Sequence, residues 1–388
     1  MEAKIIKVDI QRPLFYNVVR EGKFTPGGKL SMGLSKYDLD TPALLLNQEA
    51  LERNIAKMAA WSQEMDCAVR PHFKVHRTVR IARQQLAAGA VGITCAKLAE
   101  AEVLAEHGVE NVLLANEVAG ERKISRLVSL AERINFVVFV DHLEVTRQIA
   151  RTARRRGVTV EVLVEVDVGM HRCGVPPGPE AVQLARLVAQ EEGLRFRGLA
   201  AYEGHLVALE PGPEKTRQIK EALQPLGELR AQLEAEGLPV EMVCAAGTGS
   251  FMITGTLPYV DEVHPGTYAL MDLLYAKAGA PFEFAMTVLA TVISKRPGRL
   301  ITDAGLKALH PVFGWPQVGG QDNLTVRFLS AEHGVLNAQG QTEVQVGDKL
   351  EFIPYYADGT INLFERWYVI RGEEVVDVWP MEARGCSK

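Results

Sequence analysis

Short apolar runs alternate with longer segments of helical periodicity from about residue 40 to residue 270, and this rhythm most constrains the fold. The nine runs are ALLL (43–46), CAVRPHF (67–73), VGITCA (91–96), NVLLAN (111–116), INFVVFVD (134–141), TVEVLVEVD (159–167), LRFRGLAAY (194–202), VEMVCAA (240–246) and YVDEV (259–263). Runs that are apolar throughout are typical of strands covered on both faces of a parallel sheet. Between them, apolar residues recur at helical spacing, as Leu51, Ile55 and Met58 do. The pattern therefore predicts parallel strands joined by helices.

The number of these strand–helix units favours one architecture. Eight units over roughly 230 residues match the length and rhythm of a (β/α)8 barrel. Nine runs are one too many, and we expect the first, 43–46, to lie outside the barrel. A doubly wound open sheet is the alternative, although no GxGxxG motif follows the first run.

The pattern changes after residue 275. Stretches such as NLTVRFL and FERWYVI alternate polar with apolar residues, are rich in β-branched and aromatic residues, and are separated by Gly and Pro turns. We therefore expect an α/β fold in which a (β/α)8 TIM-type barrel (36–275) is followed by a mostly antiparallel C-terminal β domain (276–388). The turn-rich segment 1–35 is expected to join the β domain.

Composition excludes several classes of protein. A net charge of -5 gives no electrostatic basis for binding nucleic acid. The five cysteines are odd in number and contain no CxxC pair, which argues against zinc ribbons and disulfide frameworks and favours a reducing compartment. No stretch reaches the roughly 18 apolar residues of a membrane span, and the N-terminus has no apolar signal core. We therefore expect a cytoplasmic protein with no membrane or nucleic-acid partner.

Reactive groups in a barrel lie at the carboxyl ends of its strands and in the loops that follow. The second run ends in RPHFKVHR (70–77), where Lys74 lies among cationic neighbours. Such neighbours can lower the pKa of the amine and allow it to act as a nucleophile or to form a Schiff base. A solvated loop lysine is the ordinary alternative.

Three further strand ends carry polar groups. The sixth run is followed by GMHRCG, whose glycines flank Arg172, and the seventh by YEGH, which contains Tyr202 and His205. The eighth leads into GTGS (247–250), where backbone amides and two hydroxyls can form an anion-binding turn at the usual phosphate position of a barrel. Each motif alone is also compatible with a tight turn or a buried histidine. Together, an amine, a phosphate cradle, an arginine and aromatic rings around one barrel mouth indicate pyridoxal 5'-phosphate.

A family resemblance rests on these motifs and on others that flank them. DLDTPALLL, RPHFKVHR, VDVGMHRCGV, YEGH, GTGSF, HPGTYALMD and TDAGLKAL resemble the family of D-threonine aldolases and D-serine dehydratases, which are alanine racemase-like, fold-type III pyridoxal phosphate enzymes. The likeness runs from about residue 38 to residue 380. It implies a barrel with a C-terminal β domain, a small D-amino acid as substrate, and a homodimer in which each β domain helps to close the partner's active site.

The resemblance also implies roles for individual residues. Lys74 matches the Schiff-base lysine, Arg172 the arginine on the ring side of the cofactor, and Tyr202 a tyrosine near the ring, with His205 close by. The phosphate-binding turn and the HPGTY tyrosine match Thr248, Gly249, Ser250 and Tyr268.

The chain departs from this family at the metal ligands. Members usually carry a His-x-Cys or His-x-Asp pair in the C-terminal domain, whereas this chain has Tyr356 followed by Asp358. A neutral phenol is a poor ligand for a divalent ion because its pKa is near 10. Asp358 therefore remains as one metal ligand at most. We expect no tightly bound zinc, with magnesium or manganese as the only alternatives.

Without a metal, acid–base catalysis must come from side chains, and the candidates are His72, His76, His205 and Tyr356. The first expected reaction is cleavage of a D-3-hydroxy amino acid to glycine and an aldehyde. Dehydration of a D-hydroxy amino acid to a 2-oxo acid and ammonia is the second. Racemisation with Lys74 and Tyr355 or Tyr356 as the two bases is the third, and a non-catalytic carrier of pyridoxal phosphate stays as a fourth interpretation.

Overall fold

Eight parallel strands form one sheet of the computed structural model, which describes residues 33–388. In sheet order they are β2 (Ala68–Val69), β9 (Glu262–Val263), β8 (Met242–Ala245), β7 (Leu194–Ala201), β6 (Val160–Val166), β5 (Asn135–Val140), β4 (Asn111–Leu114) and β3 (Ile93–Cys95). A parallel bridge between His72 and Thr94 joins β2 to β3, the two ends of this order. The sheet is thereby closed, and the predicted barrel is confirmed. The segment 1–32 of the predicted N-terminal part lies outside the described residues.

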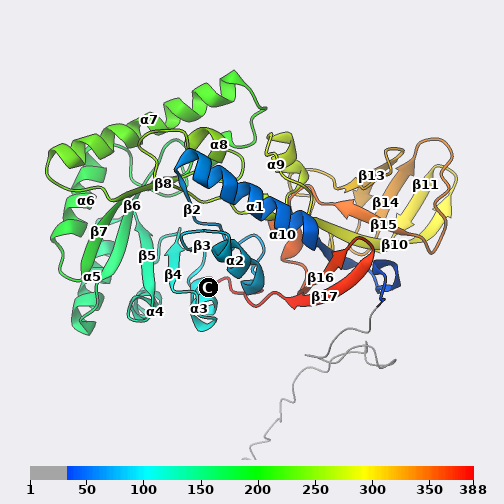
Figure 1. Cartoon of the computed structure of the whole chain (residues 1–388), viewed down its shortest axis with the longest axis horizontal. Coiled ribbons are helices and arrows are strands. Elements are labelled where there is room, and N and C mark those ends of the chain that lie inside the picture. The colour runs from blue at the N-terminus through cyan, green and yellow to red at the C-terminus, as the bar shows by residue number, and fades with distance from the viewer. Residues whose placement is uncertain (1–32) are drawn as a thin grey trace, which may run out of the picture.

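Helices follow the strands and cover the outside of the barrel (Figure 1). They are α1 (Gln48–Met65), α2 (Val79–Ala87), α3 (Leu98–Glu106), α4 (Glu121–Ala131), α5 (Leu143–Arg156), α6 (Pro179–Gln190), α7 (Pro213–Ala235) and α8 (Phe251–Thr254). Local chemistry sets their ends. The Asn47 side chain accepts a hydrogen bond from the backbone of Ala50 at the start of α1, and α5 ends at Gly157 with a φ of 66°, a conformation that glycine adopts without strain.

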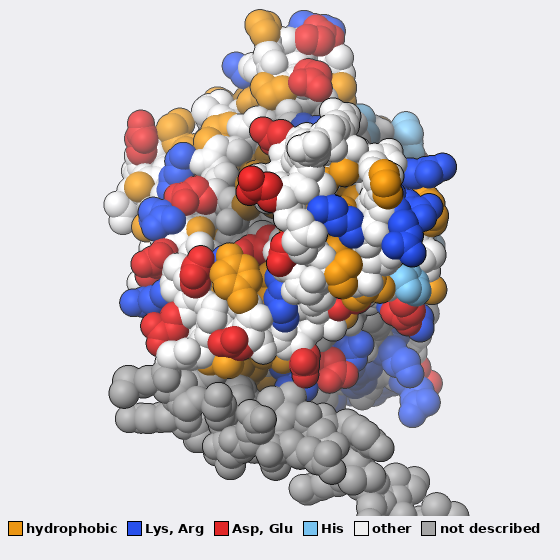
Figure 2. All heavy atoms as spheres, turned by 90° about the vertical axis from the view of Figure 1, so that its right-hand side faces the viewer, with side chains coloured by type: hydrophobic (Ala, Val, Ile, Leu, Met, Phe, Trp, Pro, Cys, Tyr) orange, Lys and Arg blue, Asp and Glu red, His pale blue; other side chains and the backbone are white. Residues whose placement is uncertain are grey.

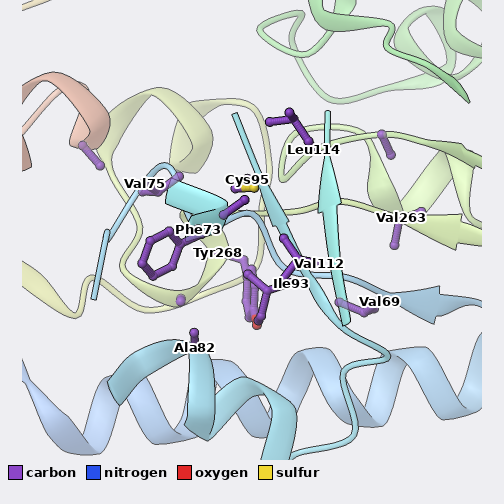
Figure 3. Close-up of a cluster of buried hydrophobic side chains, with 14 of the residues drawn as sticks. Val69, Phe73, Val75, Ala82, Ile93, Cys95, Val112, Leu114, Val263 and Tyr268 are labelled. Atoms are coloured by element: carbon purple, nitrogen blue, oxygen red, sulfur yellow. The ribbon is translucent and has the colours of Figure 1, made fainter. Parts of the chain in front are cut away.

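The apolar runs supply a continuous core between strands and helices. Figure 3 shows part of it, where Phe73 and Tyr268 lie with Ile93 and Val112 above Ala82 of α2. Phe73, Ile93 and Val112 are completely buried. Burying side chains of this size stabilises the fold by about 1.5–3 kcal/mol each. The loop that carries Lys74 therefore starts from a rigid base.

A second, nine-stranded sheet is mostly antiparallel and forms the C-terminal domain. Its order is β11 (Arg299–Thr302), β14 (Gly334–Ala338), β13 (Leu324–Leu329), β12 (Gln317–Val318), β15 (Lys349–Ile353), β10 (Met286–Arg296), β1 (Ala43–Asn47), β16 (Arg366–Arg371) and β17 (Glu374–Pro380). A further pairing of β11 with β10 closes six of these strands on themselves. The predicted β domain is therefore present.

Strand β1 comes before the barrel in sequence but pairs in the second sheet. It runs antiparallel to β10 and parallel to β16, with Leu44 opposite Val288. The expectation that 43–46 lies outside the barrel is confirmed, although this stretch falls inside the range predicted for the barrel. This stretch lies outside the barrel because both edges of β1 are paired with strands of the C-terminal domain. The first four residues of β1 are buried in that domain's sheet.

Two short helices at the junction bring the C-terminal domain over the barrel mouth (Figure 1). They are α9 (Leu273–Lys277) and α10 (Ala357–Ile361). The buried Asp272 carboxylate accepts one hydrogen bond from the backbone of Tyr275, at 3.0 Å, and one from that of Ala357, at 2.8 Å. This carboxylate fixes the segment that contains Tyr356 and Asp358 against the barrel.

The free end of the C-terminal domain is seen end-on in Figure 2, where hydrophobic side chains are scattered among acidic and basic ones. Among the described residues, no helix is both long enough and apolar enough to cross a membrane.

Candidate active site

A cavity of about 360 Å³ opens at the carboxyl ends of the barrel strands. Residues that follow β2, β4, β6, β8 and β9 line it, together with Tyr275 of α9. This is the end of a parallel barrel at which loops from several strands converge. The sequence motifs at the strand ends therefore meet in one place.

Lys74 lies in the turn after β2 and lines the cavity. Its Nζ is 3.5 Å from Oδ2 of Asp358, which comes from α10 of the C-terminal domain. The negative charge of Asp358 raises the pKa of Lys74, and burial opposes this shift only in part. The sequence suggested a pKa lowered by cationic neighbours. The structure differs because the carboxylate of the second domain is the strongest influence on the amine.

His72 also lines the cavity, and its Nδ1 is buried without a hydrogen-bond partner among the described residues. Burial and the nearby charge of Lys74 hold the pKa of His72 well below its usual range, so the imidazole is neutral. His264 faces the same cavity, and its Nε2 is 2.8 Å from Oε1 of Glu262. Glu262 in turn accepts two hydrogen bonds from Arg70, which anchors this side of the site.

Arg172 lies in the loop after β6, with its guanidinium 5.6 Å from the centre of the Tyr202 ring. Its Nη2 is 3.6 Å from Oε1 of Glu165. Burial raises the pKa of Tyr202, which therefore stays protonated. The ring of Tyr202 lies against Gly247, where an added Cβ would be 3.3 Å from it. A planar aromatic face and a permanent cation thus border the cavity together.

The GTGS turn follows β8, and Gly247 and Thr248 line the cavity. The Thr248 hydroxyl accepts a hydrogen bond from the backbone of Tyr268, and Ser250 accepts one from the backbone of Gly247. A Cβ on Gly249 would lie 2.8 Å from Val207, so only glycine fits at that position. The turn is therefore built tightly, and Gly266 and Thr267 line the cavity beside it.

Several predicted residues lie away from the cavity. Tyr268 is buried in the core, where its hydroxyl accepts a hydrogen bond from Gln85. His76 is fully buried and accepts a hydrogen bond from the backbone of Thr78. His205 is exposed at the rim, next to Gly169. The structure therefore brings together only part of the predicted set. A position at the end of a barrel strand brings a residue near the mouth but does not determine whether its side chain points into the cavity.

Tyr356 and Asp358 approach the cavity from the C-terminal domain. The Tyr356 ring packs edge-to-face on Phe313, with 5.0 Å between ring centres. Burial, followed by the charge of Asp358, raises the pKa of Tyr356, so the phenol stays protonated over the working range of an enzyme.

Sequence reasoning missed Tyr275, Glu117 and Glu165, all of which line the cavity. Glu165 could have been identified from the sequence, because a carboxylate inside the apolar run TVEVLVEVD is unusual for a strand buried on both faces. Glu117 directly follows another run. Nothing comparable marks Tyr275, which reaches the site only because α9 folds back over the mouth.

The cavity fits a small phosphorylated aldehyde. It offers the Lys74 amine, a glycine-containing turn with the Thr248 hydroxyl, and the aromatic face of Tyr202.

The residues around Asp358, in contrast, do not fit a metal ion. Among residues 33–388, no three His, Cys, Asp or Glu ligand atoms converge around Asp358, and the Lys74 ammonium lies 3.5 Å from it. A cation there would have to find most of its ligands outside the protein.

Comparison with known proteins agrees with the fold and the site. The chain matches the model of the alanine racemase N-terminal domain over residues 46–273 and that of a putative serine dehydratase domain over residues 285–370. A D-threonine aldolase of Arthrobacter sp. is 35% identical over 356 residues, covering 90% of this chain and 94% of the relative. A 3-hydroxy-D-aspartate aldolase of Paracoccus denitrificans is 34% identical over 366 residues, covering 91% and 94%.

Related dehydratases and a solved structure extend the comparison. A D-threo-3-hydroxyaspartate dehydratase of Delftia sp. is 30% identical and covers 88% of this chain and 97% of the relative. The crystal structure of a D-threonine aldolase from Filomicrobium marinum has a TM-score of 0.90 at 38% identity, covering 93% of this chain and all of that one. These relatives are lyases, and pyridoxal phosphate is the cofactor that the fold implies. The chain belongs to the alanine racemase-like family of D-threonine aldolases and D-serine dehydratases.

Proposed function

We propose that this protein is a pyridoxal phosphate-dependent aldolase that cleaves a D-3-hydroxy amino acid into glycine and an aldehyde. One observation carries the proposal: a lysine amine, a carboxylate and a protonated phenol from two domains meet over a cavity of about 360 Å³. The D-threonine and 3-hydroxy-D-aspartate aldolases among its relatives support the choice of reaction.

The cavity residues divide into those that hold the cofactor and those that move protons. Lys74 provides the amine for the aldehyde of pyridoxal phosphate, and the turn with Thr248, Gly249 and Ser250 holds the phosphate. Arg172 and Tyr202 face the ring. When bound, the cofactor supplies an electron sink that weakens the bonds at Cα of an amino acid. Tyr268 acts indirectly, because its backbone N–H fixes the Thr248 hydroxyl at 3.1 Å.

Cleavage of the Cα–Cβ bond requires a base for the proton of the β-hydroxyl. His72 is neutral because its pKa is lowered, and Asp358 is a carboxylate beside the amine, so both can accept a proton. Tyr356 stays protonated and is suited to donate a hydrogen bond to the departing aldehyde oxygen. Cα must then take a proton, which Lys74 can deliver. His76 and His205 have no place in this scheme, because the imidazole of His76 is buried away from the cavity and that of His205 is exposed at the rim.

We propose that no zinc is tightly bound. Among the described residues, no set of three His, Cys, Asp or Glu ligand atoms includes Asp358, and a phenol with a raised pKa is a poor ligand. A hard ion such as magnesium or manganese could bind Asp358 weakly, with water and substrate oxygens completing its shell.

Two alternative reactions use the same residues. Dehydration to a 2-oxo acid and ammonia is favoured by the dehydratase relatives. Racemisation with Lys74 and Tyr355 or Tyr356 as bases is favoured by the alanine racemase match. Incubation with D-threonine, D-serine and D-alanine separates the three. We expect glycine and acetaldehyde from D-threonine as the fastest reaction; pyruvate from D-serine or L-alanine from D-alanine as the fastest would overturn the aldolase proposal.

We also propose a homodimer that buries an apolar segment beside the mouth. Val312, Phe313 and Trp315 are 55%, 58% and 47% exposed, and Phe313 packs on Tyr356 of the site. Exposed apolar clusters of this kind mark interaction surfaces. Sedimentation should show a dimer, and Trp315→Glu should give monomers with a lower kcat. An unchanged mass for this variant, or a monomeric wild type, would contradict the assignment.

We place the protein in the cytoplasm. All five cysteines are free, and three of them, Cys67, Cys95 and Cys244, are buried. Free thiols persist in a reducing compartment. Fractionation of the source cells with an antibody to this chain should recover it with cytoplasmic markers.

A further inference from the structure

A cluster of acidic side chains lies across the barrel from the GTGS turn. Glu117 follows β4, Asp141 follows β5, and Glu165 is at the end of β6. In the closed order of eight strands, β4 stands opposite β8, which carries the turn. A carboxylate oxygen of Glu117, one of Asp141 and the sulfur of Cys173 all lie within 4.8 Å of one another. The cavity thus has a carboxyl end as well as a phosphate end.

Glu117 lacks the donors that a buried carboxylate requires. Both of its carboxylate oxygens are buried and, in the part of the chain that the structure describes, neither accepts a hydrogen bond of standard geometry; the Cys173 thiol, which is a weak donor, lies nearby. Leaving a buried acceptor unsatisfied costs about 1–3 kcal/mol, and more for a charged group. Glu165 lies beside Glu117 and is only 5% exposed. A proton on Glu165 would supply the missing donor.

We propose that Glu117 and Glu165 form a carboxyl pair that shares one proton, and that this pair positions the Arg172 guanidinium at the ring end of the cavity. The inference deepens the proposed function, because it assigns what holds the cation that faces the cofactor ring. Burial, the hydrogen bond with Glu117 and the charge of Glu117 all raise the pKa of Glu165 well above its usual range. The other groups that face the pair are Arg172, Asp141 and Cys173.

Arg172 has few other restraints. Its side chain is 51% exposed, and Glu165 is its only ionic partner among the described residues. Its other contact is the face of Tyr202 at 5.6 Å. If the pair holds one proton, it carries a single negative charge next to the Arg172 guanidinium. If it holds none, the carboxylates of Glu117 and Glu165 would both be charged at a buried site close to Asp141. The shared proton therefore lets a carboxyl reach Arg172 without that repulsion. Glu165 is thus a positioning residue.

Cys173 reports the charge of the pair. Burial, followed by the contact with Glu117 and by the charges of Glu117 and Glu165, raises the pKa of the Cys173 thiol to about 12. Cys386 is the one other cysteine that is not buried, so full-length protein with Cys386→Ser reacts with iodoacetamide mainly at Cys173. The alkylation rate at pH 8 in chain freed of cofactor measures the thiolate fraction. This readout does not depend on the reaction that the enzyme catalyses.

The two models of the pair predict different rates. If one proton is shared and stays on Glu165, Glu165→Gln replaces a neutral carboxyl by a neutral amide and leaves the charge of Glu117, so this variant changes the rate by less than about twofold. The double variant removes the last charge and should raise the rate by about tenfold, a thiol pKa lower by about one unit. Two ionised carboxylates would give a large increase already for Glu165→Gln, and that result would overturn the proposal. Glu161→Gln, on the same strand but paired with Arg195, is the matched control.

The positioning of Arg172 is tested in the holoenzyme. We expect Glu165→Leu to shift the pH titration of the bound cofactor's absorbance in the same direction as Arg172→Leu, with no further shift in the double variant. Glu165→Gln should restore the wild-type titration, because its amide can still donate to Glu117 and accept from Arg172. Independent, additive shifts would show that Glu165 does not act through Arg172. Failure of the proposed reaction would change neither this titration nor the alkylation rates.

Discussion

Nζ of Lys74 and Oδ2 of Asp358 lie 3.5 Å apart, although one residue belongs to the barrel and the other to the C-terminal domain. The pair couples the charge of the cofactor-binding amine to the placement of the second domain. Asp272 fixes this placement, since it accepts a hydrogen bond from Ala357, the residue before Asp358.

Lys74→Ala should abolish covalent attachment of the cofactor and leave the fold intact, because a partly exposed cavity lysine contributes little to the core. Treatment with borohydride, followed by mass analysis of peptides, measures the attachment. Lys277→Ala removes an exposed lysine of α9 outside the cavity and serves as the control. Cofactor fixed at full occupancy in the Lys74 variant would show that another residue is the anchor.

Asp358→Asn should lower the pKa of Lys74, because the carboxylate is the largest influence that raises it. More of the amine is then neutral at pH 7, so cofactor should attach to the stripped protein faster, while kcat falls if Asp358 accepts a proton. The rate of attachment against pH, followed by absorbance, is the measurement. An attachment profile that coincides with wild type would contradict the coupling between the two residues.

The buried ion pair of Arg70 with Glu262 should make the protein sensitive to acid. Burial opposes the ionisation of Glu262, yet Arg70 and His264 lower its pKa to about 2. A depressed carboxyl pKa gives stability that is present above the unfolded value of about 4.3 and is lost as the pH falls towards 2. Glu262→Gln should cost about 3–5 kcal/mol of unfolding free energy, because Arg70 is left buried without its partner.

The control for this variant is Glu283→Gln, which breaks the exposed pair with Arg53 and should cost less than about 1 kcal/mol. Urea unfolding at pH 7 gives both values, and the same measurement at about pH 3 gives the loss of stability in acid. Equal costs for the buried and the exposed pair would refute the argument.

Treatment with EDTA decides the role of metals. We expect no stoichiometric zinc in the purified protein, and activity that either survives the chelator or is raised only by millimolar magnesium or manganese. Metal analysis and assays after adding back each ion are the measurements. Zinc at one ion per chain, with activity lost on its removal, would show that ligands other than Asp358 complete a site. Full activity in EDTA would favour Tyr356 as an acid–base group.

Much of the fold could be predicted because it depends on local patterns. The apolar runs became barrel strands, and the excess run at 43–46 became β1 of the other sheet. Four residues that were predicted from their positions at strand ends line the cavity, namely Lys74, Arg172, Tyr202 and Thr248.

What the sequence left open depends on side-chain direction and on contacts between domains. Tyr268 sits in the right loop but points into the core, where Gln85 holds its hydroxyl. The sequence predicts a lowered pKa for Lys74, and this prediction is wrong. Asp358, which raises the pKa, is 284 positions away in sequence and lies next to Lys74 only in the folded chain. Glu165 was hidden in an apolar run. Spacing along one strand carries no information about such partners.

The position of β1 has a consequence for how the molecule can be divided. Because β1 lies between β10 and β16, the first described strand of the chain is an interior strand of a sheet whose other strands all follow the barrel in sequence. A fragment that ends at residue 275 would carry β1 with both of its edges bare, and a fragment that begins there would have a gap between β10 and β16. The C-terminal sheet, and with it the active site that this domain covers, is therefore completed only after β16 has been synthesised.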